Sequence, residues 1–368
     1  MFERNASNNV QEYVRKLPDH SRYENVSAVT CDDRTRIDHS GFAEGTSAPL
    51  LPVIFELGLN HLGDPLRARR MIETLARSGA THVTLQVVTD PANITRDPSA
   101  IAFLGRATLP IGDVHALIRY ASELGLVAGA TLLDENDVPG LVGAGVRFFK
   151  ILSSDLTFIP LILEAARTGY PTYLSTAAAT FHEIGDVMAR VKAEISFADV
   201  RLIHTVLEIP TPIERINLRN IPFLQESFGA RVAYGQHSDV HEALLAAAVL
   251  GADALFVYVA EERSEKLPDG PHAVLCADVG ALLTGIRRAL DTLGSRERRD
   301  DPDAEVLRRK IRRSAVARKA LAAGHVLTPA DIAFKRPGSG IEAFAVQSIL
   351  GVPLAAAVAA GDDIPAQR

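Results

Sequence analysis

The chain has 368 residues, of which 47% are hydrophobic and 23% are charged, so it suits a soluble globular protein with one large and one small domain. Its formal net charge of −6 provides no global positive field, so we expect no binding to nucleic acid and none to an anionic membrane. The two cysteines are far apart and lack metal-like spacing, which argues against a disulfide framework and favours the cytoplasm.

The first 48 residues are polar and show little hydrophobic periodicity. We interpret residues 1–48 as an N-terminal extension, either an arm with a short helix near residues 9–17 or a disordered tail. The first 20 residues lack the apolar core of a signal peptide.

From residue 52 onward, short apolar runs alternate with helical patterns. The runs that we predict to be strands are 53–59, 82–88, 126–133, 147–152, 171–176, 200–206, 231–237 and 252–259. Continuous apolar strands separated by helices are typical of a parallel sheet that is buried on both faces. Eight such units predict an α/β fold, a (β/α)₈ TIM barrel over residues 49–293. A doubly wound open sheet is the alternative, but no GxGxxG follows the first strand.

The remaining chain differs in pattern. Residues 294–310 are highly charged and contain a proline, which predicts a linker. Residues 311–368 have short apolar runs and a glycine turn, which predict a small β-rich domain. A domain of this size has a limited core, so we expect docking to stabilise it.

Active-site groups of TIM barrels lie at the carboxyl ends of the strands. The polar residues that we select there are Glu56, Asn60, Gln86, Lys150, Ser153, Asp155, Ser175, His204 and His237. Glu56 stands in an apolar run, where a carboxylate is costly unless it is paired. Lys150 lies between two apolar residues and requires an anion, either a carboxylate such as Glu56 or the phosphate of a ligand.

His204 and His237 end the sixth and seventh predicted strands, which are neighbours in a barrel. Two imidazoles there could share one divalent metal ion and leave positions open for substrate and water. The alternative is a pair of separate histidines, each held by its own hydrogen bonds.

Several motifs in series resemble the sialic acid synthase (N-acetylneuraminate synthase-like) family. FELGLNHLGD (55–64) resembles AEIGxNHNGD, FKILSSDLTFIPLI (149–162) resembles FKIxSxExTNxPLL, and VAYGQHSDV (232–240) resembles GYSDHT. KLPDGPHAV (266–274) is similar to the LPGPDH loop. Residues 312–341, which contain KRPGSGI, resemble the SAF (antifreeze-like) domain that ends these proteins.

The resemblance implies that phosphoenolpyruvate condenses with the open-chain aldehyde of an N-acetylated hexosamine, giving a nonulosonic acid and phosphate. It implies a divalent cofactor, with Mn²⁺ favoured over Mg²⁺ or Co²⁺, held by His204 and His237. Glu56 would contact the sugar or handle a proton near it, and Asp155 would contact the sugar. Lys150, Ser153 and Ser175 would hold phosphoenolpyruvate, with Asn60 and Gln86 as further binding residues. Arg336 would reach the barrel of a neighbouring subunit in a domain-swapped homodimer.

Some positions depart from the family pattern. Thr84 replaces the lysine of VKFQ, Gln236 replaces the aspartate of SDH, and Tyr258 stands in the stretch aligned with EKHFT. A lost charge-assisted hydrogen bond weakens donor binding by roughly 1.5–3 kcal/mol. Two alternatives to the condensation therefore remain: another reaction on the same barrel, with a different donor or lyase chemistry, or a non-catalytic protein that binds a sugar or a partner.

Overall fold

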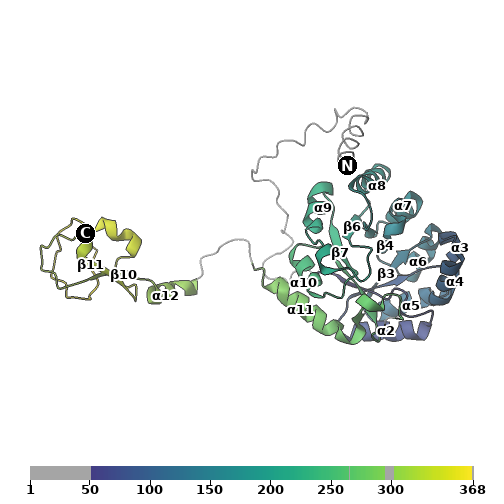
Figure 1. Cartoon of the computed structure of the whole chain (residues 1–368), viewed down its shortest axis with the longest axis horizontal. Coiled ribbons are helices and arrows are strands. Elements are labelled where there is room, and N and C mark those ends of the chain that lie inside the picture. The colour runs from purple at the N-terminus through teal and green to yellow at the C-terminus, as the bar shows by residue number, and fades with distance from the viewer. Residues whose placement is uncertain (1–50, 265, 295–301, 367–368) are drawn as a thin grey trace, which may run out of the picture. The chain divides into compact units, whose positions relative to one another are not determined.

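The computed structural model describes residues 51–264, 266–294 and 302–366, and these fall into two compact units that divide after Thr292. The predicted extension, residues 1–48, lies outside the described residues. The first unit is a closed parallel barrel with helices around its outside (Figure 1). The second unit is a small antiparallel β structure. The predicted TIM barrel and the small β-rich domain are therefore confirmed.

The barrel strands pair in chain order and β1 closes the ring against β8. The strands are β1 Val53–Glu56, β2 His82–Gln86, β3 Val127–Leu132, β4 Phe149–Ile151, β5 Thr172–Ser175, β6 Val200–His204, β7 Val232–Gln236 and β8 Leu255–Ala260. A short strand, β9 Val274–Leu275, adds to the edge of β8 in parallel.

Helices cover the barrel. They are α2 Pro65–Arg77, α3 Pro91–Ile94, α4 Pro98–Ala107, α5 Ile111–Glu123, α6 Val138–Ala144, α7 Ile159–Arg167, α8 Phe181–Glu194, α9 Asn220–Phe228, α10 Glu242–Val249 and α11 Val279–Asp291. Local sequence explains where α2 begins, because the Asp64 side chain accepts a hydrogen bond from the Leu66 amide and Pro65 fits the first turn. Its buried residues recur every three or four positions and face the strands.

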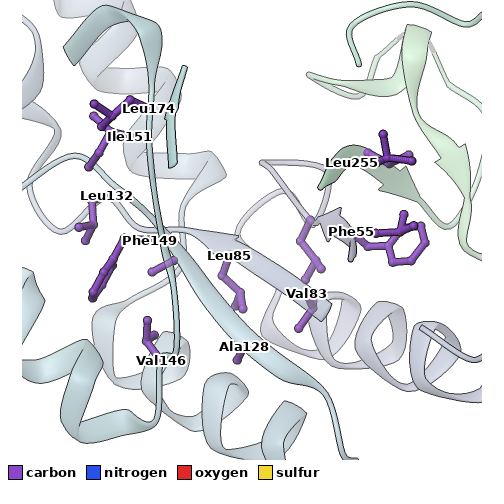
Figure 2. Close-up of a cluster of buried hydrophobic side chains, with 14 of the residues drawn as sticks. Phe55, Val83, Leu85, Ala128, Leu132, Val146, Phe149, Ile151, Leu174 and Leu255 are labelled. Atoms are coloured by element: carbon purple, nitrogen blue, oxygen red, sulfur yellow. The ribbon is translucent and has the colours of Figure 1, made fainter. Parts of the chain in front are cut away.

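Alternate residues of each strand face two different hydrophobic cores. One face of each strand packs against the helices, and Figure 2 shows part of this layer. Labelled there are Phe55, Val83, Leu85, Ala128, Leu132, Val146, Phe149, Ile151, Leu174 and Leu255. The other face fills the barrel with a separate cluster that includes Ile54, Tyr173 and Phe256. A Cβ at Gly129 would lie 2.2 Å from the ring of Phe148, so this glycine makes room for the interior ring.

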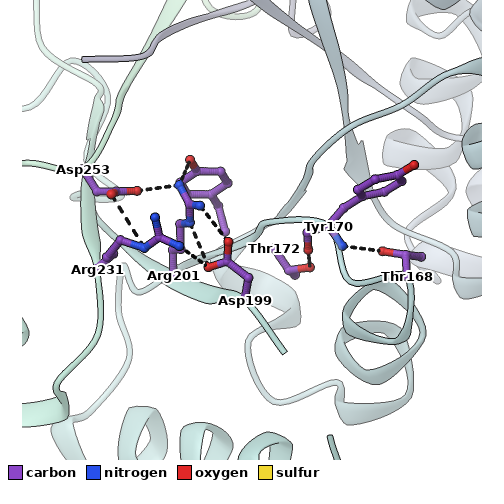
Figure 3. Close-up of polar contacts among 8 residues, drawn as sticks. Thr168, Tyr170, Thr172, Asp199, Arg201, Arg231 and Asp253 are labelled. Carbon is purple, nitrogen blue, oxygen red and sulfur yellow. Dashed lines mark hydrogen bonds and ion pairs between the residues drawn. The ribbon is translucent and has the colours of Figure 1, made fainter. Parts of the chain in front are cut away.

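An ion-pair network joins the starts of β6, β7 and β8 (Figure 3). Arg201 donates to both carboxylate oxygens of Asp199, at 3.0 and 2.7 Å. It also donates to Asp253 and to the Tyr173 hydroxyl, each at 2.8 Å. Arg231 donates to Asp199 at 2.8 Å. These ion pairs therefore hold together the end of the barrel at which the strands begin. The candidate site lies at the opposite end, where the strands terminate.

The second unit pairs β10 Ser314–Ala317 with β11 Ile332–Lys335, and its core includes Leu321, Leu327 and Ile349. The segment predicted as a linker contains a helix, α12 Pro302–Ile311. Glu305 forms ion pairs with Arg308 and Arg309 one turn further on, and acidic residues precede basic ones along the helix. Both features stabilise a helix that the charge density alone did not reveal.

Candidate functional site

A cavity of about 450 Å³ lies where the barrel strands end. Its polar lining includes Lys150, Ser153, Ser175, Thr205, His237 and Tyr258. Four of these were predicted site residues, and they come from β4, β5 and β7 or from the turns that follow these strands. The fold therefore brings Lys150, Ser153, Ser175 and His237 to one cavity, as expected for carboxyl ends of strands in a barrel.

Lys150 and Glu56 form a buried ion pair inside the barrel mouth. Both side chains are about 5% exposed or less. Lys150 Nζ also lies 5.2 Å from the ring centroid of Tyr258. Burial raises the pKa of Glu56, although the neighbouring ammonium acts in the opposite direction. Of the two partners that the sequence left open for Lys150, the structure shows the carboxylate.

His237 presents one free ring nitrogen to the cavity. Its Nδ1 donates to the carbonyl oxygen of Val206 at 2.6 Å, because a carbonyl can only accept. Burial, with a smaller contribution from Lys150, lowers the pKa of His237 to about 4. The imidazole is therefore neutral near pH 7 and keeps a lone pair on Nε2, which is the state of a metal ligand held through its other nitrogen.

His204 lies on the other face of its strand, which corrects the predicted metal pair. Ile203 and Thr205 line the cavity, so the residue between them points toward the helices. Its Nε2 donates to the carbonyl oxygen of Ile216 at 2.8 Å, and its ring packs 6.2 Å from that of Tyr234. This geometry does not place His204 and His237 around one ion; for His204 it matches the alternative of a separately hydrogen-bonded histidine.

The other predicted residues are not among the described residues that line the cavity. Asn60 uses its amide on backbone groups, donating to Val259 O at 2.8 Å and accepting from Asp269 N at 3.0 Å. Gln86 is half-buried at the end of β2. Asp155 accepts a hydrogen bond from Ser154 at 2.9 Å, and burial raises its pKa. Arg336 is exposed in the second unit, and its role in a homodimer stays a prediction.

A model of the NeuB family matches residues 71–298 of the chain. The chain belongs to the NeuB family. A model of the SAF domain matches residues 312–368. The chain is 30% identical to the uncharacterized protein MJ1065 of Methanocaldococcus jannaschii, over 79% of this chain and 86% of that protein. It is 26% identical to the N,N'-diacetyllegionaminic acid synthase of Campylobacter jejuni, over 81% and 94%.

Solved structures resemble this NeuB family member in fold. One is the N-acetylneuraminic acid synthetase of Leptospira borgpetersenii, with a TM-score of 0.65 at 24% identity, covering 70% of this chain and 90% of that one. No single helix among the described residues is long and apolar enough to cross a membrane. The helices Pro98–Ala107 and Ile111–Glu123 are long and apolar enough only when they are taken together, and the chain bends by 45° at the break between them.

Sequence reasoning did not select Asp269 and His272, two buried residues that lie close to the cavity of this NeuB family member. Both belong to the segment similar to the LPGPDH loop, which was the available signal. His272 is buried, and its ring centroid lies 5.4 Å from that of His237. The Asp269 carboxylate accepts from the Leu59 amide at 3.4 Å. A Cβ at Gly58 would lie 2.4 Å from this carboxylate, so the two segments touch closely.

In this NeuB family member, His237 is suited to bind a divalent ion, because its ring is neutral and its Nε2 carries a free lone pair. Among the described residues, no group of three or more His, Cys, Asp or Glu side chains is arranged to hold an ion. The described residues therefore supply at most two such ligands, and substrate oxygens or water would complete the coordination.

Asp269 should make stability depend on pH. Burial, with a contribution from Glu56, raises its pKa to about 6 from the usual 3.8. A raised carboxyl pKa stabilises the fold fully below pH 4, and this contribution is lost as the pH rises through 6. We expect Asp269→Asn to have a higher free energy of unfolding than the unsubstituted protein at pH 7, by on the order of 2 kcal/mol. At pH 4 we expect no such difference. Urea unfolding at the two pH values measures this, and an equal difference at both would contradict it.

Proposed function

We propose that the barrel cavity condenses phosphoenolpyruvate with the open-chain aldehyde of an N-acetylated hexosamine, giving a nonulosonic acid and inorganic phosphate. The observation that carries the proposal is the meeting of Lys150, Ser153, Ser175 and His237 in one cavity of a NeuB family barrel. A cation and two hydroxyls suit the charged donor. The C. jejuni relative, which matches most of this chain, is named for the synthesis of such an acid.

In the proposed reaction, C3 of phosphoenolpyruvate forms a bond with the aldehyde carbon, and the aldehyde oxygen gains a proton. Water then adds at C2, and the bond between C2 and the phosphate oxygen breaks as phosphate leaves. A divalent ion bound at His237 would polarise the aldehyde oxygen. Lys150 would bind the anionic donor, which would release Glu56 from its ion pair to accept a proton.

A second candidate is the same barrel acting on a less highly charged donor. Lys150 is the one Lys or Arg among the described residues that line the cavity. Thr84, which stands where the family pattern has a lysine, is buried, and its hydroxyl has no hydrogen-bond partner. The pocket thus offers fewer cations to a phosphorylated donor than the family pattern predicts.

Phosphate release tests the proposal. The protein is incubated with phosphoenolpyruvate, Mn²⁺ and each of a panel of N-acetylated hexosamines. We expect release that requires a sugar and that falls at least about 100-fold in His237→Ala, because loss of an essential electrophilic group costs at least a few kcal/mol of transition-state stabilisation.

His182→Ala is the matched control, because His182 is an exposed histidine on α8. It should release phosphate at the unsubstituted rate. Folded protein that releases no phosphate with any sugar would overturn the proposal. Consumption of pyruvate or cleavage of a nonulosonic acid in the same assay would then favour the second candidate.

A further inference from the structure

His272 is a buried histidine without a hydrogen-bond partner. It ends the short 3-10 helix η4 Gly270–His272, and its side chain is 2% exposed. Neither Nδ1 nor Nε2 has a hydrogen-bond partner among the described residues. Leaving two buried polar atoms unsatisfied is costly, so such a group usually has a ligand or a chemical role.

The surroundings of His272 favour a neutral ring that faces His237. Burial, then the nearby His237 and Lys150, lower the pKa of His272 to about 3. Its ring meets those of His237 at 5.4 Å and Tyr258 at 5.0 Å, edge to face in each case. Lys150 is a cation that would oppose a metal ion here, and Glu56 forms an ion pair with it and balances its charge.

The spacing of the two rings fits one shared ion. Imidazole nitrogens bind Zn²⁺ at about 2.1 Å, and two such rings around one tetrahedral ion have centroids about 5 Å apart. The measured centroid separation of 5.4 Å is close to this value. Nε2 of His237 is available, because its Nδ1 donates to Val206.

The loop that carries His272 is held in place by other residues. The Asn60 side chain donates through Nδ2 to the Val259 carbonyl oxygen in β8 and accepts at Oδ1 from the Asp269 amide, so it joins the loop to the strand. A Cβ at Gly270 would lie 2.0 Å from the carbonyl oxygen of Ser264, so the turn before His272 closes tightly. A ligand on such a fixed loop needs little rearrangement to bind an ion.

We propose that His237 and His272 together bind one divalent transition-metal ion of the class that favours imidazole, such as Co²⁺ or Zn²⁺. The pair places the ion beside the cavity that Lys150 and Tyr258 line and leaves its other positions open. This inference deepens the proposed function, since it names the metal ligands of the same site. Its test uses the metal alone, so its failure can be told from failure of the condensation.

Co²⁺ binding to the full chain provides the test, because its visible absorption reports nitrogen ligands. Equilibrium dialysis gives the stoichiometry and affinity for the unsubstituted protein, His237→Asn, His272→Asn and His204→Asn, each checked for folding by circular dichroism. We expect one ion per chain, weakened at least about 100-fold in the first two variants, and unchanged in His204→Asn. X-ray absorption of the unsubstituted complex should count two imidazoles, which needs no variant.

Several outcomes would overturn the proposal: no Co²⁺ bound, unchanged binding in folded His272→Asn, loss of binding in folded His204→Asn, or fewer than two imidazoles at the ion. If His272→Asn does not fold, His272→Gln replaces it, and the imidazole count still decides. Metal binding as expected without any phosphate release would leave this inference standing and would contradict only the proposed condensation.

Discussion

Replacing Lys150 by methionine is expected to abolish phosphate release and to lower the free energy of unfolding by about 3–5 kcal/mol. The reason is that Glu56 would remain buried without its counter-ion, in a barrel mouth where the side chain is 4% exposed. Methionine keeps a similar length, so the packing beside Phe256 and Tyr258 is largely retained. Urea unfolding at pH 7 and the phosphate assay measure the two effects.

The double variant Glu56→Leu, Lys150→Met separates the two roles of the pair. Apolar residues of similar volume can replace a buried ion pair with little loss of stability, so the double variant should regain most of the unfolding free energy. It should remain inactive, because the cation for the donor is absent. Phosphate release by the folded double variant would show that Lys150 has only a structural role.

The second large effect is expected from Arg201→Met, far from the cavity. Burial alone would raise the pKa of Asp199, but hydrogen bonding and attraction to Arg201 outweigh it and lower the pKa. Without the guanidinium, which is 12% exposed, Asp199 and Asp253 lose their main partner and repel each other. We expect the free energy of unfolding to fall by about 2–4 kcal/mol, less than for a fully buried pair.

Arg190→Met is the control for this change, since Arg190 forms an exposed ion pair with Glu194 on α8. Its effect should stay within about 0.5 kcal/mol. The phosphate-release rate of folded Arg201→Met, measured well below its melting temperature, should equal that of the unsubstituted protein. A slower rate in fully folded protein would mean that the base of the barrel influences the site.

The barrel could be predicted because its strands are short, mainly apolar runs bounded by polar residues. A strand that is buried on both faces needs mainly apolar side chains, so it is visible in the sequence as such a run. The helices α3 and α4 were missed, although Asp90 with Pro91 and Asp97 with Pro98 are start signals. Both helices are short, and few of their residues are buried. Their hydrophobic pattern was therefore too weak to detect.

The site was harder to predict than the fold because strand ends are visible in a sequence while strand faces are not. Ile203 and His204 end β6, and Thr205 follows it. The strand sequence VRLIH mixes apolar and polar residues without strict alternation, so the pattern does not show which residue points inward. Lys150 and Ser175 happened to face the cavity, whereas His204 did not. His272 was missed because it lies in a loop, and only folding brings it beside His237.

The amide of Asn60 has a consequence for how the site could change. The loop bearing Asp269 and His272 is joined to the barrel by the two hydrogen bonds of the Asn60 side chain and by the Leu59 amide, which donates to Asp269. The strand β9 that follows the loop pairs with β8. Barrel strands cannot be exchanged without disturbing both cores, whereas this loop is held by a small number of contacts and its other positions can vary in sequence. The side chains that this loop brings to the rim of the cavity can therefore change while the barrel stays the same. We expect loops transplanted from relatives that keep the hydrogen bonds of Asn60 to pack against this barrel.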